Sequence, residues 1–254
     1  MKTLFALTFI AASRTMLHAA FIPSPSVGPI NDASAIPFLT DTNGAASVRY
    51  QQVYGASDFA GQGSPAYLIT EISFAAVVAP DRTAGPNVQI FLSTTSSSVD
   101  SLSPVFANNL GPNNTLVYSG PIDWTAGSRY GHGTFAFGIP LQQPFLYTWS
   151  AGNLLMDVRN YQTVPPPPEG YPHPLFEARN TLGDTVSLAA AFDVNSPTAS
   201  LFVNTVGLST LFTVTGVPEP SSAFLLLAGL SVLAFLGWRP RGHVRANRDV
   251  VETR

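Results

Sequence analysis

The stretch Thr134-Phe-Ala-Phe-Gly-Ile-Pro-Leu141 alternates large apolar residues with small or polar ones. In an extended chain, Phe135, Phe137, Ile139 and Leu141 point to one side and the residues between them point to the other. A sustained period of two is typical of a β-strand with one buried face. The stretch therefore predicts a strand whose apolar side packs on a core.

The same alternation recurs along the middle of the chain. It is clearest at Val88, Ile90 and Leu92, and again at Leu154, Met156 and Val158. Further candidate strands lie at 47–54, 67–78, 115–119, 145–149, 176–179, 186–192 and 208–214. Helical periodicity is nearly absent, and clusters of Gly, Pro, Asn, Asp and Ser separate the runs. The pattern predicts an all-β, antiparallel β-sandwich that is jelly-roll-like, and it disfavours a parallel α/β sheet, which needs crossover helices.

The composition excludes several classes of protein. The chain has 254 residues, of which 11% are charged, and it contains no cysteine. Disulfide scaffolds, iron–sulfur sites and zinc fingers are thereby excluded. Lys2 is the single lysine and the interior has no basic cluster, so no nucleic-acid partner is expected. Residues 21–216 carry five arginines against twelve carboxylates, and this acidic balance favours solubility.

The N-terminal segment 1–20 has the layout of a secretory signal peptide. A basic start is followed by an apolar stretch over 4–12 and by the small residues Ala19 and Ala20. This layout predicts cleavage after Ala19 or Ala20. The alternative is that the segment is a strand or helix of the fold. The proline-rich segment 21–46 is predicted to be an irregular N-terminal arm or to contain a short first strand.

A second signal occupies residues 217–254. The uncharged run 223–238 would extend about 24 Å as a helix, so it spans a bilayer only with its flanking residues at the interfaces. The basic tail 239–254 begins with Arg239 and Arg241, which act as stop-transfer charges and keep the tail cytoplasmic. The pattern predicts a single transmembrane helix over 223–238, and everything before it faces outward. The alternative is a buried core helix.

The motif Val217-Pro-Glu-Pro-Ser-Ser222, followed by the apolar run and arginines, resembles the PEP-CTERM sorting signal of Gram-negative bacteria. In that family an exosortase, a membrane-embedded cysteine transpeptidase, recognises the Pro-Glu-Pro segment. It then releases the passenger or transfers it to another surface anchor. The resemblance implies export across the inner membrane, a membrane-anchored precursor, and a final place at the cell surface or outside the cell. It assigns the sorting motif to Val217, Pro218, Glu219, Pro220 and Ser221.

The region between the two signals also resembles a known type of domain. Segments with strand character lie at 67–74, 87–95, 105–109 and 151–158. They resemble bacterial extracellular domains that occur with interchangeable surface anchors, the choice-of-anchor type. This resemblance covers residues from about 48 to 215, and it implies a secreted β domain over 47–216 without assigning a role to it.

Catalytic chemistry has little support in the sequence. There is no Gly-x-Ser-x-Gly elbow, and His132, which could pair with Asp123, is expected in a turn. Asp157 alternates with the apolar Met156 and Val158, which predicts an outward-facing carboxylate. Glycosidase carboxylates cannot be paired by sequence spacing, and no Asp-x-Asp-x-Asp-Gly calcium loop is present. No catalytic residue, cofactor or metal ligand is predicted, and calcium is the cation kept as an alternative.

The hypothesis for a binding function is that aromatic side chains of the domain contact carbohydrate. An exposed aromatic ring can stack on a sugar face while its polar tip stays wet, whereas aromatics near strand ends more often cap a core. The sequence thus predicts an exported, non-enzymatic structural or adhesive protein of the exopolysaccharide matrix or biofilm. The alternative is a carbohydrate-binding or carbohydrate-processing secreted sandwich. The aromatic candidates near turns are Trp124, Tyr130, Tyr161 and Tyr171, together with Trp149.

Overall fold

The computed structural model describes residues 19–25, 31–38, 47–78, 84–123, 135–161, 175–203 and 205–217. Within these ranges the regular elements are strands and three short 3₁₀ turns. The strands are β1 (Ala19–Ser24), β2 (Asp32–Ser34), β3 (Val48–Tyr54), β4 (Ala66–Val78), β5 (Ala84–Thr95), β6 (Thr115–Asp123), β7 (Phe135–Tyr147), β8 (Asn153–Asn160), β9 (Leu175–Asn180), β10 (Val186–Ala191), β11 (Leu201–Val203), β12 (Val206–Leu208) and β13 (Thr210–Val217). The turns are η1 (Ala56–Asp58), η2 (Phe106–Asn109) and η4 (Trp149–Ala151).

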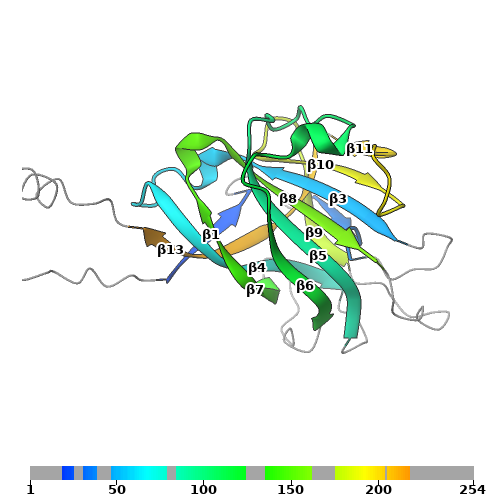
Figure 1. The fold of residues 1–254 in the computed structure, drawn as a ribbon, viewed down its shortest axis with the longest axis horizontal. Helices are drawn as coiled ribbons and strands as arrows, with labels where there is room; N and C mark the ends of the chain where they lie inside the picture. The colour runs from blue at the N-terminus through cyan, green and yellow to red at the C-terminus, as the bar shows by residue number, and fades with distance from the viewer. Residues whose placement is uncertain are drawn as a thin grey trace, which may run out of the picture. The chain divides into compact units, whose positions relative to one another are not determined.

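The strands form two sheets packed as a sandwich, and every pairing between them is antiparallel (Figure 1). Sheet 1 has the order β1-β13-β4-β9-β12, with β7 also paired to β4 and β2 to β9. Sheet 2 has the order β11-β10-β3-β8-β5-β6. The predicted antiparallel β-sandwich is therefore confirmed.

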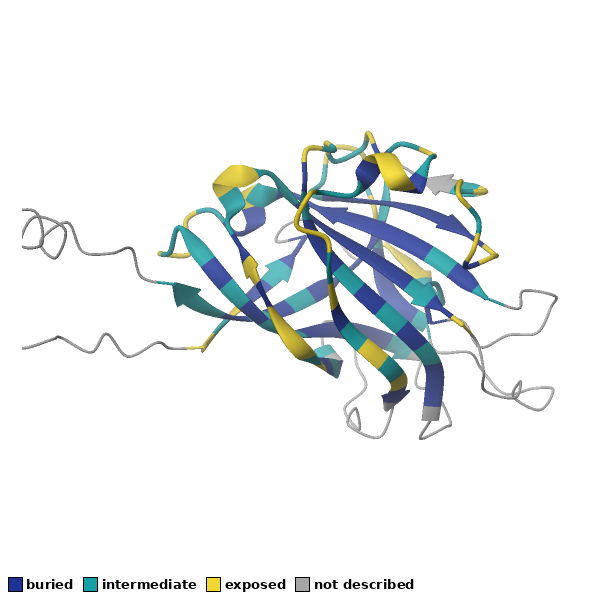
Figure 2. Ribbon diagram, viewed as in Figure 1, coloured by how far each residue is buried: buried dark blue, intermediate teal, exposed yellow. Residues whose placement is uncertain are grey.

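The alternating runs supply the core between the sheets, as Figure 2 shows by the change of burial along single strands. Phe137 and Ile139 of β7 are buried, and so is each apolar residue of the alternating runs in β5 and β8. Because successive side chains of a strand point to opposite faces, each run places its large residues on the partner sheet. At roughly 25 cal/mol per Å² of apolar surface removed from water, this shared core is the main source of stability.

Aromatic side chains pack against one another, mostly edge to face, at the centre of the sandwich. Phe212 of β13 lies 4.9 Å, centroid to centroid, from Tyr54 and 5.4 Å from Phe59. Farther along, Phe38 contacts Phe74 and Phe176 at 5.1 and 5.4 Å. Edge-to-face geometry brings the positive edge of one ring to the negative face of the other. The last strand is thus a full member of the core.

The stretch predicted as an irregular arm contributes β1 and β2 to sheet 1. Ile22 in β1 and Phe38 after β2 are completely buried. Pro23 and Pro25 are tolerated here because β1 is an edge strand, where an amide hydrogen is not needed on the free side. The predicted signal-peptide cleavage after Ala19 or Ala20 would leave Phe21–Ser24 paired with β13.

Asp157 differs from its prediction as an outward-facing carboxylate. It does point away from the core between the sheets, yet its exposed fraction is 1%. The segment 96–111, which includes η2, folds over this face of sheet 2 and adds a second apolar cluster there. Alternation reports which face a residue occupies, but not what covers that face. The second cluster consists of Val53, Leu102, Phe106, Leu155, Ala189 and Ala191.

A polar network fastens this covering segment to sheet 2. Arg49 Nη2 donates to Asp157 Oδ2 at 2.9 Å, and the guanidinium carbon lies 4.6 Å from the centre of the Phe106 ring. Gln51 Nε2 donates to the same carboxylate and to the Phe106 carbonyl, at 3.3 and 3.2 Å. Asn109 Nδ2 donates to Gln51 Oε1 at 2.9 Å. Charge and amide groups buried together in this way satisfy one another.

Gly111 ends the covering segment, and we expect Gly111→Ala to destabilise the domain. A Cβ at this position would lie 1.7 Å from the Thr94 carbonyl oxygen, which is backbone and cannot rotate away. The backbone must shift, at a cost of about 1–3 kcal/mol in the free energy of unfolding. Urea denaturation of the purified domain measures the change. Equal midpoints for wild type and variant would contradict this close approach.

Candidate functional site

The end of β13 is the point at which the chain leaves the sandwich toward the predicted sorting motif. Thr215 pairs with Ala19 of β1 on one side, and Val217 pairs with Ala66 of β4 on the other. The candidate strand at 208–214 therefore extends to Val217, the first residue of that motif. No spacer separates the last strand from Pro218.

Ser64 holds the end of β13 in place, and each of its polar groups is used. Its hydroxyl is shared between the carbonyl oxygens of Val217 and Ala66, at 3.0 and 2.7 Å. Its amide donates to the Tyr67 hydroxyl at 3.2 Å. Its carbonyl accepts from Trp149 Nε1 at 2.9 Å. We call Ser64, Tyr67, Trp149 and Val217 the Ser64 clasp.

Trp149 serves the clasp, although sequence analysis considered it for carbohydrate contact. Its ring is partly buried against the main core, and its one polar group donates to Ser64. Of the two roles considered for an aromatic residue near a strand end, sugar stacking and capping of the core, Trp149 has the second. Sequence reasoning missed Ser64 altogether, because the run Gly61-Gln-Gly-Ser-Pro65 signals a turn without identifying the strand that the turn packs against.

The other aromatic candidates divide between described and undescribed residues. Tyr161 follows β8 with 39% of its surface exposed, and its hydroxyl donates to Gln89 Oε1 at 2.9 Å. It remains a candidate for stacking on a sugar. Trp124, Tyr130 and Tyr171 lie outside the described residues, as does His132.

A shallow cleft of about 390 Å³ opens at one end of the sandwich, close in sequence to Trp149. Asn113 braces its wall, because its side chain accepts from the Thr94 amide at 2.7 Å and donates to the Thr94 hydroxyl at 3.1 Å. The lining contains hydroxyl, amide and apolar groups and no ionisable side chain: Thr94, Thr95, Ser96, Leu110, Gly111, Pro112, Asn113, Thr148 and Ala151.

None of the carboxylates in the described ranges lines this cleft. Asp58 is buried and accepts hydrogen bonds from the hydroxyls of Ser24 and Thr185, so it anchors β1 to η1. Burial raises the pKa of Tyr147, and the nearby charge of Asp58 adds to the effect. Burial likewise raises the pKa of Asp184, because removal from water disfavours the charged form.

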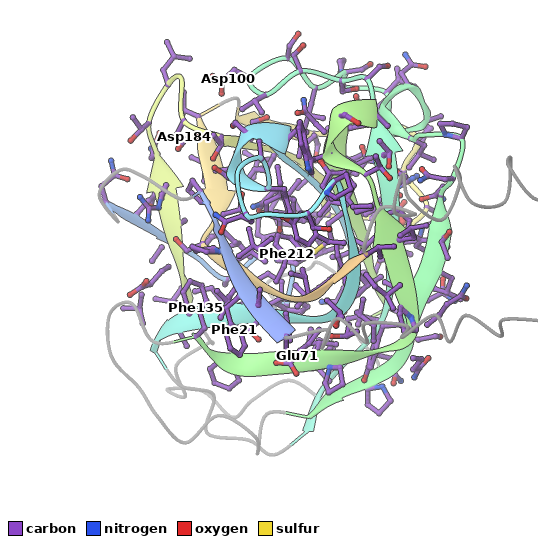
Figure 3. The ribbon with its side chains drawn as sticks, turned by 90° about the vertical axis from the view of Figure 1, so that its left-hand side faces the viewer. Phe21, Glu71, Asp100, Phe135, Asp184 and Phe212 are labelled. Atoms are coloured by element: carbon purple, nitrogen blue, oxygen red, sulfur yellow. The ribbon has the colours of Figure 1, made fainter. Side chains whose placement is uncertain are left out.

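Asp184 and Asp100 lie at the same end of the domain in Figure 3. Each has one carboxylate oxygen without a hydrogen-bond partner. Calcium takes six to eight oxygen ligands. In the part of the chain that the structure describes, no three His, Cys, Asp or Glu residues are placed to hold a metal. The pair therefore adds no support to the calcium alternative.

Most of the sorting segment lies outside the described residues. This holds for Pro218, Glu219, Pro220 and Ser221, for the apolar run 223–238, and for Arg239 and Arg241. The residues that the structure does describe include no helix long and apolar enough to cross a membrane. The signal peptide and the transmembrane helix therefore stay predictions.

Comparison with known proteins identifies the C-terminal segment. No curated protein and no solved structure matches the chain. Residues 216–241 match the PEP-CTERM protein-sorting motif. This match begins within the last two residues of β13, at the point where the Ser64 clasp holds the strand. The chain therefore carries a PEP-CTERM sorting motif, which marks it as an exported protein that is anchored in the membrane before an exosortase processes it.

Proposed function

We propose that the β domain is a structural or adhesive component of the cell surface or the extracellular polysaccharide matrix, placed there after processing by the exosortase. Its role in this proposal is to bind neutral parts of a polysaccharide, without catalysis. The cell is Gram-negative, and the processed domain contributes to biofilm cohesion.

The observation that carries this proposal is the chemistry of the cleft between Ser96 and Thr148. Hydroxyl and amide groups there match the hydrogen-bonding groups of sugars, and apolar residues such as Pro112 and Leu110 match the faces of sugar rings. Glycosidases need two carboxyl groups facing the bond that is cut. The lining offers none, so the cleft supports binding rather than hydrolysis.

The charge of the domain supports the same role. Residues 21–216 have an excess of seven carboxylates over arginines. A net charge well away from zero keeps an exported domain soluble at the high local concentrations of a matrix. Contact with polysaccharide then depends on neutral groups, of the kind that line the cleft, together with exposed rings such as that of Tyr161.

Affinity gel electrophoresis of the processed protein tests this function. We expect the polysaccharide of the producing cell, cast into the gel, to slow wild-type migration. Ser96→Leu should restore free migration, because it replaces an exposed hydroxyl of the cleft with a bulky apolar group. Ser101→Leu is the matched control, since Ser101 is exposed on the same segment but does not line the cleft.

A separate variant, Tyr161→Ala, tests the exposed ring on sheet 2. Loss of retardation only in this variant would move the contact from the cleft to Tyr161. Free migration of the wild-type protein in gels containing each polysaccharide of the host, its own exopolysaccharide included, would contradict the adhesive function.

A further inference from the structure

Only a short segment separates the folded domain from the apolar run. Five residues, 218–222, lie between Val217 at the end of β13 and Ala223. Even when fully extended, five residues reach at most about 18 Å. An enzyme that works on Pro218–Pro220 therefore meets a folded domain immediately next to its substrate segment.

The last residues of β13, where the motif begins, are not free to bind an enzyme. A protein that binds an extended peptide commonly forms hydrogen bonds with the backbone amide and carbonyl groups of that peptide. Thr215 in β13 lies between β1 and β4, and Gly216 and Val217 pair with β4. The Val217 carbonyl is additionally held by Ser64. The end of β13 must separate from the sheet before an enzyme can use it.

We propose that the Ser64 clasp limits the rate at which the exosortase processes the sorting segment. The clasp holds β13 closed as far as Val217, so that processing requires a local opening of the last residues of the strand. Ser64 is a positioning residue here and touches no reacting atom. The inference rests on exosortase processing, which the sorting motif marks, and is independent of polysaccharide binding.

The test compares rates of precursor conversion in cells that express the full chain. After pulse labelling, we expect Ser64→Ala to be converted about three to ten times faster than wild type, because one hydrogen bond of ordinary net strength resists opening by about that factor. Trp149→Phe should act in the same direction, because it keeps a ring against the core and removes the donor to the Ser64 carbonyl.

Ser209→Ala is the matched control. Ser209 precedes β13 at its other end, is 3% exposed, and has a hydroxyl without a hydrogen-bond partner. The same chemical change there should leave the conversion rate at the wild-type value. A change in rate for Ser209→Ala would mean that a buried serine-to-alanine change by itself alters conversion, independently of the clasp.

A spacer separates this role from a merely structural one. Insertion of Gly-Ser-Gly-Ser between Val217 and Pro218 lets the enzyme reach its segment without opening the strand. In that background, Ser64→Ala should no longer change the conversion rate. Unchanged or slower conversion of Ser64→Ala without the spacer, or an equal gain with it, would overturn the inference. If wild type itself is never converted, exosortase processing fails and the inference fails with it.

Discussion

Replacing Phe212 with alanine should lower the free energy of unfolding of the β domain by about 3–5 kcal/mol. Phe212 is completely buried on β13, and its ring packs edge to face on Tyr54 and tilted against Phe59. The truncated side chain leaves a cavity between two sheets that cannot collapse freely, so the loss exceeds the transfer free energy of the missing ring. Urea denaturation of purified wild type and variant measures the difference.

Phe21→Ala is the matched control for this change. Phe21 lies one residue from the β1 partner of Phe212, and both are labelled in Figure 3. The exposed fraction of Phe21 is 63%. The same truncation there should cost less than about 0.5 kcal/mol, as is usual for surface positions. Similar losses for the two phenylalanines would mean that β13 does not contribute Phe212 to the core.

Asp157→Asn should destabilise the domain by about 3 kcal/mol, the lower end of the range for breaking a buried ion pair from one side. The change leaves the guanidinium of Arg49, whose side chain is 12% exposed, without its charged partner. Contact with the Phe106 ring still stabilises that cation, which places the expected loss at the lower end. Denaturant unfolding at neutral pH is measured with Asp157 and Arg49 changed singly and together. The double-mutant cycle gives the coupling free energy between the two side chains.

Asp193→Asn provides the comparison for Asp157. Asp193 is exposed, and its carboxylate oxygen accepts from the Asn195 amide, which an asparagine side chain can also do. The expected loss is below about 0.5 kcal/mol. If the double variant of Asp157 and Arg49 lost the sum of the two single losses, the two residues would not be coupled.

Many of the strands could be predicted from the sequence because their large apolar residues recur with a period of two. Val88, Ile90 and Leu92 are each buried, and the same holds for the alternating residues of β8. Alternation is a local signal, and it assigns a residue to one face of a strand. It carries no information on which strand comes next in the sheet, so the place of β13 between β1 and β4 could not be predicted.

The candidate sites also differ in whether a local sequence signal could identify them. The sorting motif is contiguous, so its residue types and order suffice to identify it. The Ser64 clasp combines residues of a turn, of β4, of the 3₁₀ element η4 and of the last strand, and its contacts exist only after the sheets have assembled. Likewise, Leu102 and Phe106 stand isolated in an aperiodic segment, and nothing local indicates that they cover Asp157.

The pairing of β1 with β13 has a consequence for secretion. The strand that lies between β1 and β4 is the last of the described strands in chain order, so sheet 1 cannot close until that strand has been synthesised. Pairing between distant parts of a chain is slow to form. Until then, β1 and β4 expose unpaired edges that invite aggregation. The two edges that flank β13 therefore stay open to aggregation for as long as that strand is missing from the sheet.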